Sequence, residues 1–143
     1  MSPTTGCRAI MRRQAGVIGR QQALAAGLTR HQVAQLVDTN AWSRLLPGVY
    51  LAAEAPLTWQ AWAFAAVLFA GPGAVLVGPT AAALREWTPR ELPIQVAVPA
   101  QRRVRLHSTA ITVLRLDVPP DDRVTVAGLP TTTRLRTAVD VAH

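Results

Sequence analysis

The first third of the chain carries short apolar patterns that predict three helices followed by a hairpin. The predicted elements are helices over 7–16, 20–27 and 30–38, an extended GVIG stretch over 16–19, and two strands between 42 and 52. Gly27 is the residue type that most easily ends a helix, and Thr29 is placed to cap the next one. Pro47-Gly48 is a turn signal between two short apolar strands.

The rest of the chain predicts helices packed on strands. Apolar helical patterns cover residues 56–70 and 77–87, and alternating patterns typical of strands cover 93–99, 110–116 and 123–133. We expect the three strands to form a small antiparallel sheet. The segment TRLRTAVDVAH predicts the first turns of a last helix, running to His143.

Four residues in the N-terminal third have the spacing of a helix-turn-helix unit. Ala23, Gly27, Val33 and Leu36 lie at offsets of 0, 4, 10 and 13. This geometry needs a small residue where the two helices touch, a glycine at the turn, and apolar residues that hold the second helix in place. The fold class that we expect is therefore α+β, with a winged helix-turn-helix domain over 1–53 and a domain of helices on a short antiparallel sheet over 54–143.

Charge is concentrated in the same third. The net charge is +7, and arginine supplies every basic side chain. Residues 1–51 hold six arginines against the single acid Asp38, a balance of +5, whereas the remainder holds nine arginines against seven acids. Arginine binds phosphate through two hydrogen bonds, so a polyanion such as DNA is expected to contact the N-terminal third.

The predicted helix 30–38 has a polar face that suits base reading. With Val33, Leu36 and Val37 inward, His31, Gln35 and Asp38 point outward. Gln35 could read adenine and Arg30 guanine. The full predicted DNA-binding set is Arg12, Arg13, Arg20, Thr29, Arg30, His31, Gln32, Gln35 and Arg44, with Arg12, Arg13, Arg20 and Arg44 assigned to phosphate. The alternative is a solvated helix face, because Asp38 would be repelled by phosphate.

Patterns for catalysis, metal binding or a cofactor are weak, and we expect no enzyme. His31, His107 and His143 lie in unrelated contexts, and Asp121-Asp122 follows two prolines as a turn would. The four tryptophans, Trp42, Trp59, Trp62 and Trp87, are expected in the core rather than as stacking platforms for single strands.

The single cysteine and the apolar middle of the chain indicate the expected cellular compartment and whether the chain crosses a membrane. Cys7 alone excludes an internal disulfide, so a reducing cytoplasm is the expected compartment. Residues 55–84 carry no charge, but their longest clean apolar run is about ten residues, short of the roughly 20 that a membrane span needs. We expect a buried core helix there.

Three motifs make the chain resemble a known family. They are W-x-R-x-x-P-G-V-Y (42–50), GPGAV (71–75) and LPTTTRLRTAVD (129–140). With the segments GVIGRQQALAAGLTRHQVAQLVDTNAW and PIQVAVPAQRR, they resemble the N-terminal part of actinobacterial proteins related to the AbiEi abortive-infection antitoxins.

The resemblance implies a function. It implies a DNA-binding antitoxin that represses its own operon and, in type IV systems, counteracts a nucleotidyltransferase toxin without a stable complex. Such proteins usually carry several arginines on the recognition helix, where this chain has Arg30 alone. They often continue into an endonuclease-like domain. The alternative reading is a non-catalytic protein-interaction module, or a remnant of such a longer protein.

Overall fold

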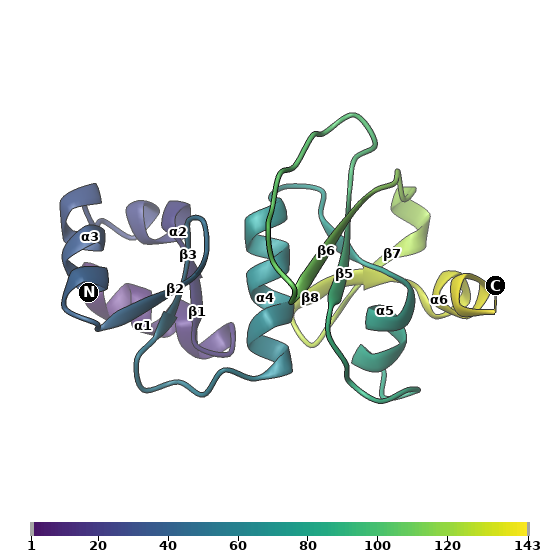
Figure 1. Ribbon diagram of the computed structural model, residues 1–143, viewed down its shortest axis with the longest axis horizontal. Coiled ribbons are helices and arrows are strands. Elements are labelled where there is room, and N and C mark those ends of the chain that lie inside the picture. The colour runs from purple at the N-terminus through teal and green to yellow at the C-terminus, as the bar shows by residue number, and fades with distance from the viewer. Residues whose placement is uncertain (1, 143) are drawn as a thin grey trace. The chain divides into compact units, whose positions relative to one another are not determined.

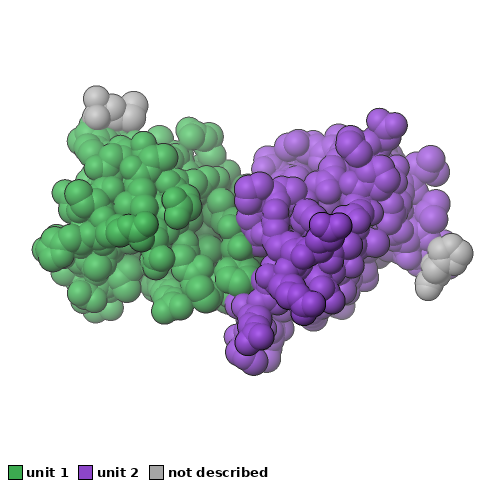
Figure 2. Space-filling view, turned by 90° about the horizontal axis from the view of Figure 1, so that it is seen from above, with its two compact units in different colours: residues 1–69 green, residues 70–143 purple. Residues whose placement is uncertain are grey.

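The computed structural model describes residues 2–142 and divides into two compact units. The first unit comprises residues 1–69 and the second residues 70–143 (Figure 2). Each unit combines helices with its own sheet, which confirms the α+β class. The domain boundary expected at residues 53 and 54 remains a prediction.

The first unit contains four helices and a three-stranded antiparallel sheet (Figure 1). Its elements are α1 (Pro3–Arg13), β1 (Val17–Gly19), α2 (Arg20–Ala25), α3 (Arg30–Asp38), β2 (Trp42–Leu46), β3 (Val49–Ala52) and α4 (Trp59–Ala70). The strand order is β1-β3-β2. The predicted helices and the hairpin around Pro47-Gly48 are confirmed, with bounds that differ by a few residues.

Apolar side chains from every layer of the first unit meet in one core. Ile18 of β1, Ala23 of α2 and Val33 of α3 are buried together with Trp42 and Tyr50 from the hairpin. The two aromatic rings stack with centroids 5.7 Å apart and planes 26° apart. Since each such ring buries a large apolar area, this pair fixes the sheet beneath the helices.

The second unit is built on a mixed five-stranded sheet. Its elements are β4 (Val75–Leu76), α5 (Gly78–Leu84), β5 (Ile94–Val98), β6 (Ile111–Arg115), the 3-10 helix η1 (Pro120–Asp122), β7 (Arg123–Val126), β8 (Leu129–Thr132) and α6 (Arg134–Val141). The strand order is β6-β5-β4-β8-β7. Val75, Leu76, Ile94, Val96 and Val98 are fully buried and form the centre of the sheet.

The expected short antiparallel sheet of three strands is wrong. Strands β5 and β6 run parallel, and β4 also pairs parallel with β8. Residues 99–110 join β5 to β6, and a connection of about a dozen residues is long enough for the crossover that parallel strands need. Segment 123–133, expected as one strand, divides into two strands at Ala127-Gly128. Strand β4 has only two residues, which is too short for an alternating pattern in the sequence to predict it.

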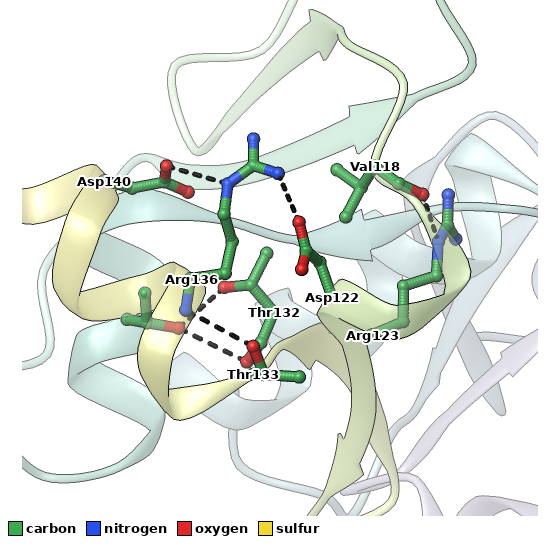
Figure 3. Close-up of polar contacts among 8 residues, drawn as sticks. Val118, Asp122, Arg123, Thr132, Thr133, Arg136 and Asp140 are labelled. Atoms are coloured by element: carbon green, nitrogen blue, oxygen red, sulfur yellow. Dashed lines mark hydrogen bonds and ion pairs between the residues drawn. The ribbon is translucent and has the colours of Figure 1, made fainter.

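Polar contacts connect helix α6 to η1 through Asp122 and to β8 through Thr132 (Figure 3). The Arg136 guanidinium forms ion pairs with Asp122 and with Asp140, each at 2.9 Å. The hydroxyls of Thr132 and Thr137 lie 2.7 Å apart in a buried position. The predicted terminal helix is therefore confirmed, while its last predicted residue, His143, lies outside the described residues.

Two expectations about apolar residues have different outcomes. Trp42 is only 7 % exposed, as core packing predicts, but Trp87 is 40 % exposed, so the core assignment of Trp87 is wrong. Trp87 follows the end of α5, where it lies beside two arginines. The uncharged segment 55–84 contains the 12-residue α4 together with β4 and α5. No helix among residues 2–142 is long and apolar enough to cross a membrane.

The β7–β8 turn offers a test of the second unit. Ala127 and Gly128 form a two-residue loop with positive φ values of 52° and 80°. An alanine resists this conformation and asparagine accepts it, so Ala127→Asn should raise the free energy of unfolding by about 0.5–1 kcal/mol. The measurement is urea denaturation. Ala138→Asn is the matched control: it places asparagine inside helix α6 and should lower stability instead. Equal effects of the two changes would contradict the turn assignment.

Candidate nucleic-acid interface

The turn between α2 and α3 is tight and depends on one glycine. Gly27 has φ +112°, a conformation that side-chain-bearing residues rarely adopt. A Cβ at this position would lie 3.0 Å from Cγ of Pro3. Leu28 then returns to the core, and its N–H donates to the carbonyl of Ala23 at 3.1 Å. The turn thus sets the direction of α3 relative to α2.

A reciprocal pair of hydrogen bonds begins α3. The hydroxyl of Thr29 accepts from the Gln32 N–H at 3.1 Å, and the Gln32 side-chain oxygen accepts from the Thr29 N–H at 2.8 Å. This capping box satisfies two backbone donors that a helix start leaves open. Both residues were predicted to contact DNA, and the contacts give them a structural role at the start of the helix.

The outward face of α3 has the residues that the helical wheel predicted. Val33 is buried, and Leu36 and Val37 pack against the same core. The exposed polar residues at the start and along the opposite face are Arg30, His31, Gln32, Gln35 and Asp38. The orientation of the helix is therefore confirmed, while the role of each side chain toward DNA stays a prediction.

Arg20 and Arg44 gather around one tyrosine. The Arg20 guanidinium donates to the Tyr50 hydroxyl from Nε at 3.3 Å and from Nη2 at 3.0 Å. Arg44 is the cross-strand partner of Tyr50 in the β2–β3 pairing, and directly paired residues share a face of a sheet. The backbone N–H of Arg20 also donates to Gly48 at the hairpin turn, at 2.8 Å. Sequence reasoning missed the positioning role of Tyr50.

Two side-chain amides hold the start of α2 in place. Gln14 and Gln22 donate to each other at 3.0 and 2.9 Å. Gln14 also donates to the carbonyl of Val17, and Gln22 accepts from the N–H of Gly19. These bonds connect α1, β1 and α2, so the backbone on both sides of Arg20 is held in place.

Arg12 and Arg13 belong to a different part of the first unit. Both are exposed in the last turn of α1, which has 11 residues. The first turn of this helix adjoins Gly27, so the two arginines lie about 15 Å along the helix from that turn. Arg12 lines a hollow of about 560 Å³ together with Arg8 and Glu54. Glu54 follows β3, at the opposite end of the hairpin from Gly48. The structure therefore groups Arg20 with Arg44 and places Arg12 elsewhere.

The remaining candidate groups have simple surroundings. Among the described residues, no three His, Cys, Asp or Glu side chains lie close enough to hold a metal ion. Cys7 is buried, and burial raises the pKa of its thiol. A thiol with a raised pKa holds less of the reactive thiolate.

The comparison with protein families found a match in the first unit. Residues 8–53 match the family model described as transcriptional regulator, AbiEi antitoxin. The matched segment begins in α1 and extends just past β3, so it contains the α2–α3 turn, the face of α3 and the hairpin. The comparison with curated proteins found no match. The family match confirms the resemblance over this segment and indicates a DNA-binding regulatory role.

Two glycine substitutions test the geometry of the turn. Gly27→Ala should lower the free energy of unfolding by at least about 1 kcal/mol, because alanine resists a positive φ. Gly6→Ala is the matched control in α1, where the nearest atom to a new Cβ would be 3.8 Å away. That change should raise stability by about 0.5–1 kcal/mol, since alanine is the better helix former. Both are measured by urea denaturation; a neutral Gly27→Ala would refute the tight turn.

Proposed function

We propose that the chain is a DNA-binding transcriptional regulator of the AbiEi antitoxin type, in which residues 1–53 form a winged helix-turn-helix. The family match over residues 8–53 carries this proposal. Two features of the structure support it: an exposed polar face on a helix that packs through its other side, and arginines gathered at an adjacent hairpin. In this arrangement α3 enters the major groove of double-stranded operator DNA and the β2–β3 hairpin acts as the wing.

Base reading falls to three residues of α3. Arg30 can donate two hydrogen bonds to guanine, Gln35 can bond adenine through its amide, and His31 can reach a base or a phosphate. Gln32 lies on the same surface but is less free to read a base, because its side-chain oxygen accepts from the Thr29 N–H at 2.8 Å. A glutamine that reads adenine uses both its side-chain oxygen and its side-chain nitrogen. Gln35 is therefore the better candidate for base reading, and Gln32 together with Thr29 serves phosphate contact.

Phosphate contact falls mainly to the wing and to the start of α2. Arg44 is exposed on β2, and Arg20 retains free guanidinium hydrogens while it is held on Tyr50. Such contacts position the protein on the duplex and supply affinity that depends on salt. Arg12 and Arg13 at the end of α1 are additional candidates for the flanking backbone.

The biological role that we propose is the one that the matched family suggests. The protein represses its own operon as the antitoxin of a type IV toxin-antitoxin system and opposes a nucleotidyltransferase toxin without forming a stable complex with it. It acts in the cytoplasm, and it has no catalytic role of its own. The second domain, residues 54–143, follows the DNA-binding domain and has its own surface for other partners.

A mobility-shift titration on the DNA upstream of the gene tests the proposal. The full chain should retard this DNA at low salt. Arg30→Ala with Gln35→Ala should reduce specific affinity at least about tenfold, since each base contact contributes roughly 1–3 kcal/mol. Arg44→Ala should weaken binding to all sequences alike and reduce the salt slope by about one. Arg103→Ala, at an exposed site of the second unit, is the control.

Two outcomes would reject the assignment. One is no retardation at low salt by folded wild-type protein. The other is a loss of binding in the Arg103→Ala control equal to the loss in the α3 variant, because α3 would then have no special role.

Asp38 provides a test in the opposite direction. Its carboxylate is exposed on the outward face of α3, where it would repel phosphate. Asp38→Asn should therefore increase DNA affinity several-fold at low salt, and the gain should shrink as salt screens the charge. Fluorescence anisotropy with labelled operator DNA measures the change. Unchanged affinity at all salt concentrations would mean that this face of α3 does not approach the DNA.

A further inference from the structure

Two arginines of the second unit lie against the same tryptophan. The guanidinium carbon of Arg85 is 5.7 Å from the ring centroid of Trp87, and that of Arg134 is 5.4 Å from it. At these distances a cation is attracted to the face of an indole. Arg85 also donates to the buried Thr137 hydroxyl at 3.2 Å. The ring thus brings together two positive charges, one from the end of α5 and one from the start of α6.

These two charges lack an acidic partner. Among residues 2–142, neither Arg85 nor Arg134 forms an ion pair; the paired arginine of α6 is Arg136, which contacts Asp122 and Asp140. Burial and the neighbouring Arg134 charge both lower the pKa of Arg85. Two like charges held together without a counter-ion favour the approach of an anionic group.

An open apolar hollow lies directly beside the arginines. It measures about 550 Å³ and is lined by Arg85, Val124, Val126, Thr133, Arg134 and Leu135. Leu135 is 77 % exposed and Val124 is 42 % exposed. Val124 and Val126 come from β7, which is the terminal strand of its sheet. Exposed apolar groups that cluster beside fixed charges are typical of an interaction surface.

We propose that this surface, formed by Arg85, Trp87, Val124, Val126, Arg134 and Leu135, binds an acidic segment of a partner protein in which carboxylates stand beside large apolar side chains. The carboxylates meet Arg85 and Arg134, and the apolar side chains cover Leu135 and the two valines. Arginine suits this task because its planar donors match a carboxylate through two hydrogen bonds.

Charge complementarity selects this partner over two others. A second copy of the chain on the same surface would bring Arg85 and Arg134 against the same pair of arginines, which is unfavourable. A phosphodiester backbone would match the arginines but would leave Leu135 and Val124 uncovered. A segment with both acidic and apolar side chains satisfies the whole surface. The proposal does not depend on DNA binding, because its residues all belong to the second unit.

Fluorescence anisotropy with two labelled peptides tests the proposal on the full chain. One short peptide alternates leucine with glutamate, and the other alternates leucine with glutamine, so that they differ in charge but not in apolar content. We expect the glutamate peptide to bind at least about tenfold more tightly, since hydrogen bonds to charged groups are the stronger ones. Equal binding of the two peptides would overturn the proposal.

Three variants locate the binding site. Arg134→Gln should remove the preference for the glutamate peptide, and Leu135→Ser should weaken both peptides about tenfold through the lost apolar contact. Both positions are exposed, so the fold should tolerate the changes. Arg103→Gln, also exposed in the second unit, is the charge-matched control and should bind like the wild type. Peptide binding that is unaffected by both Arg134→Gln and Leu135→Ser would overturn the proposal.

Two further measurements assign the surface to the other occupants if the proposal is wrong. The first measurement is binding of a DNA duplex to the Arg30→Ala/Gln35→Ala chain. If this binding falls when Arg134→Gln is added but not when Leu135→Ser is added, phosphate is the ligand of the surface. A dimer in sedimentation that Leu135→Ser converts to a monomer would identify a second copy. The proposal predicts that neither is observed, and both results are independent of operator binding by α3.

Discussion

The packing of α3 against the hairpin sheet determines where every proposed base-reading side chain lies. Val33 fits into the core beside Trp42 and Tyr50, and these three residues hold the helix and the sheet together. A helix held through one face must expose the other, which carries Arg30, His31 and Gln35. Tyr50 has a second task, because its hydroxyl holds the Arg20 guanidinium at the edge of the same core. One cluster therefore positions both the candidate base contacts and a candidate phosphate contact.

Local features of the first unit could be predicted because each depends on a few adjacent residues. Thr29 caps α3 and Gly27 takes the positive φ of the turn, as their residue types require. Val33 and Leu36 face inward at helical spacing, so the outward face followed from the same pattern. The family match ends at residue 53, just past β3, so it covers the part of the chain that holds these features.

Features that depend on distant residues could not be predicted in this way. Strand direction in the second unit is set by which strands meet, and alternation along β5 and β6 is the same whether they run parallel or antiparallel. The contact between Arg20 and Tyr50 joins residues 30 positions apart and has no signal in either segment. Trp87 is expected in the core with the other tryptophans, but its ring is exposed and lies against Arg85 and Arg134, which are distant from one another in sequence. Gln32 is expected among the DNA-contacting residues, and only the geometry shows that its side-chain oxygen is engaged in the cap of α3.

The count of arginines overstates the charge that a nucleic acid would meet, because many of these side chains serve the fold of the second unit. Arg136 is paired with two carboxylates, Arg123 donates to the carbonyls of Val118 and Gly73, and Arg102 donates to that of Ala70. A guanidinium already engaged in this way has fewer donors for a phosphate. In the first unit, Arg30 and Arg44 are exposed and outside any ion pair among the described residues. The electrostatic case for DNA binding therefore rests on where the exposed arginines lie: Arg30 begins α3 and Arg44 lies on β2, whereas Arg12 and Arg13 lie at the end of α1.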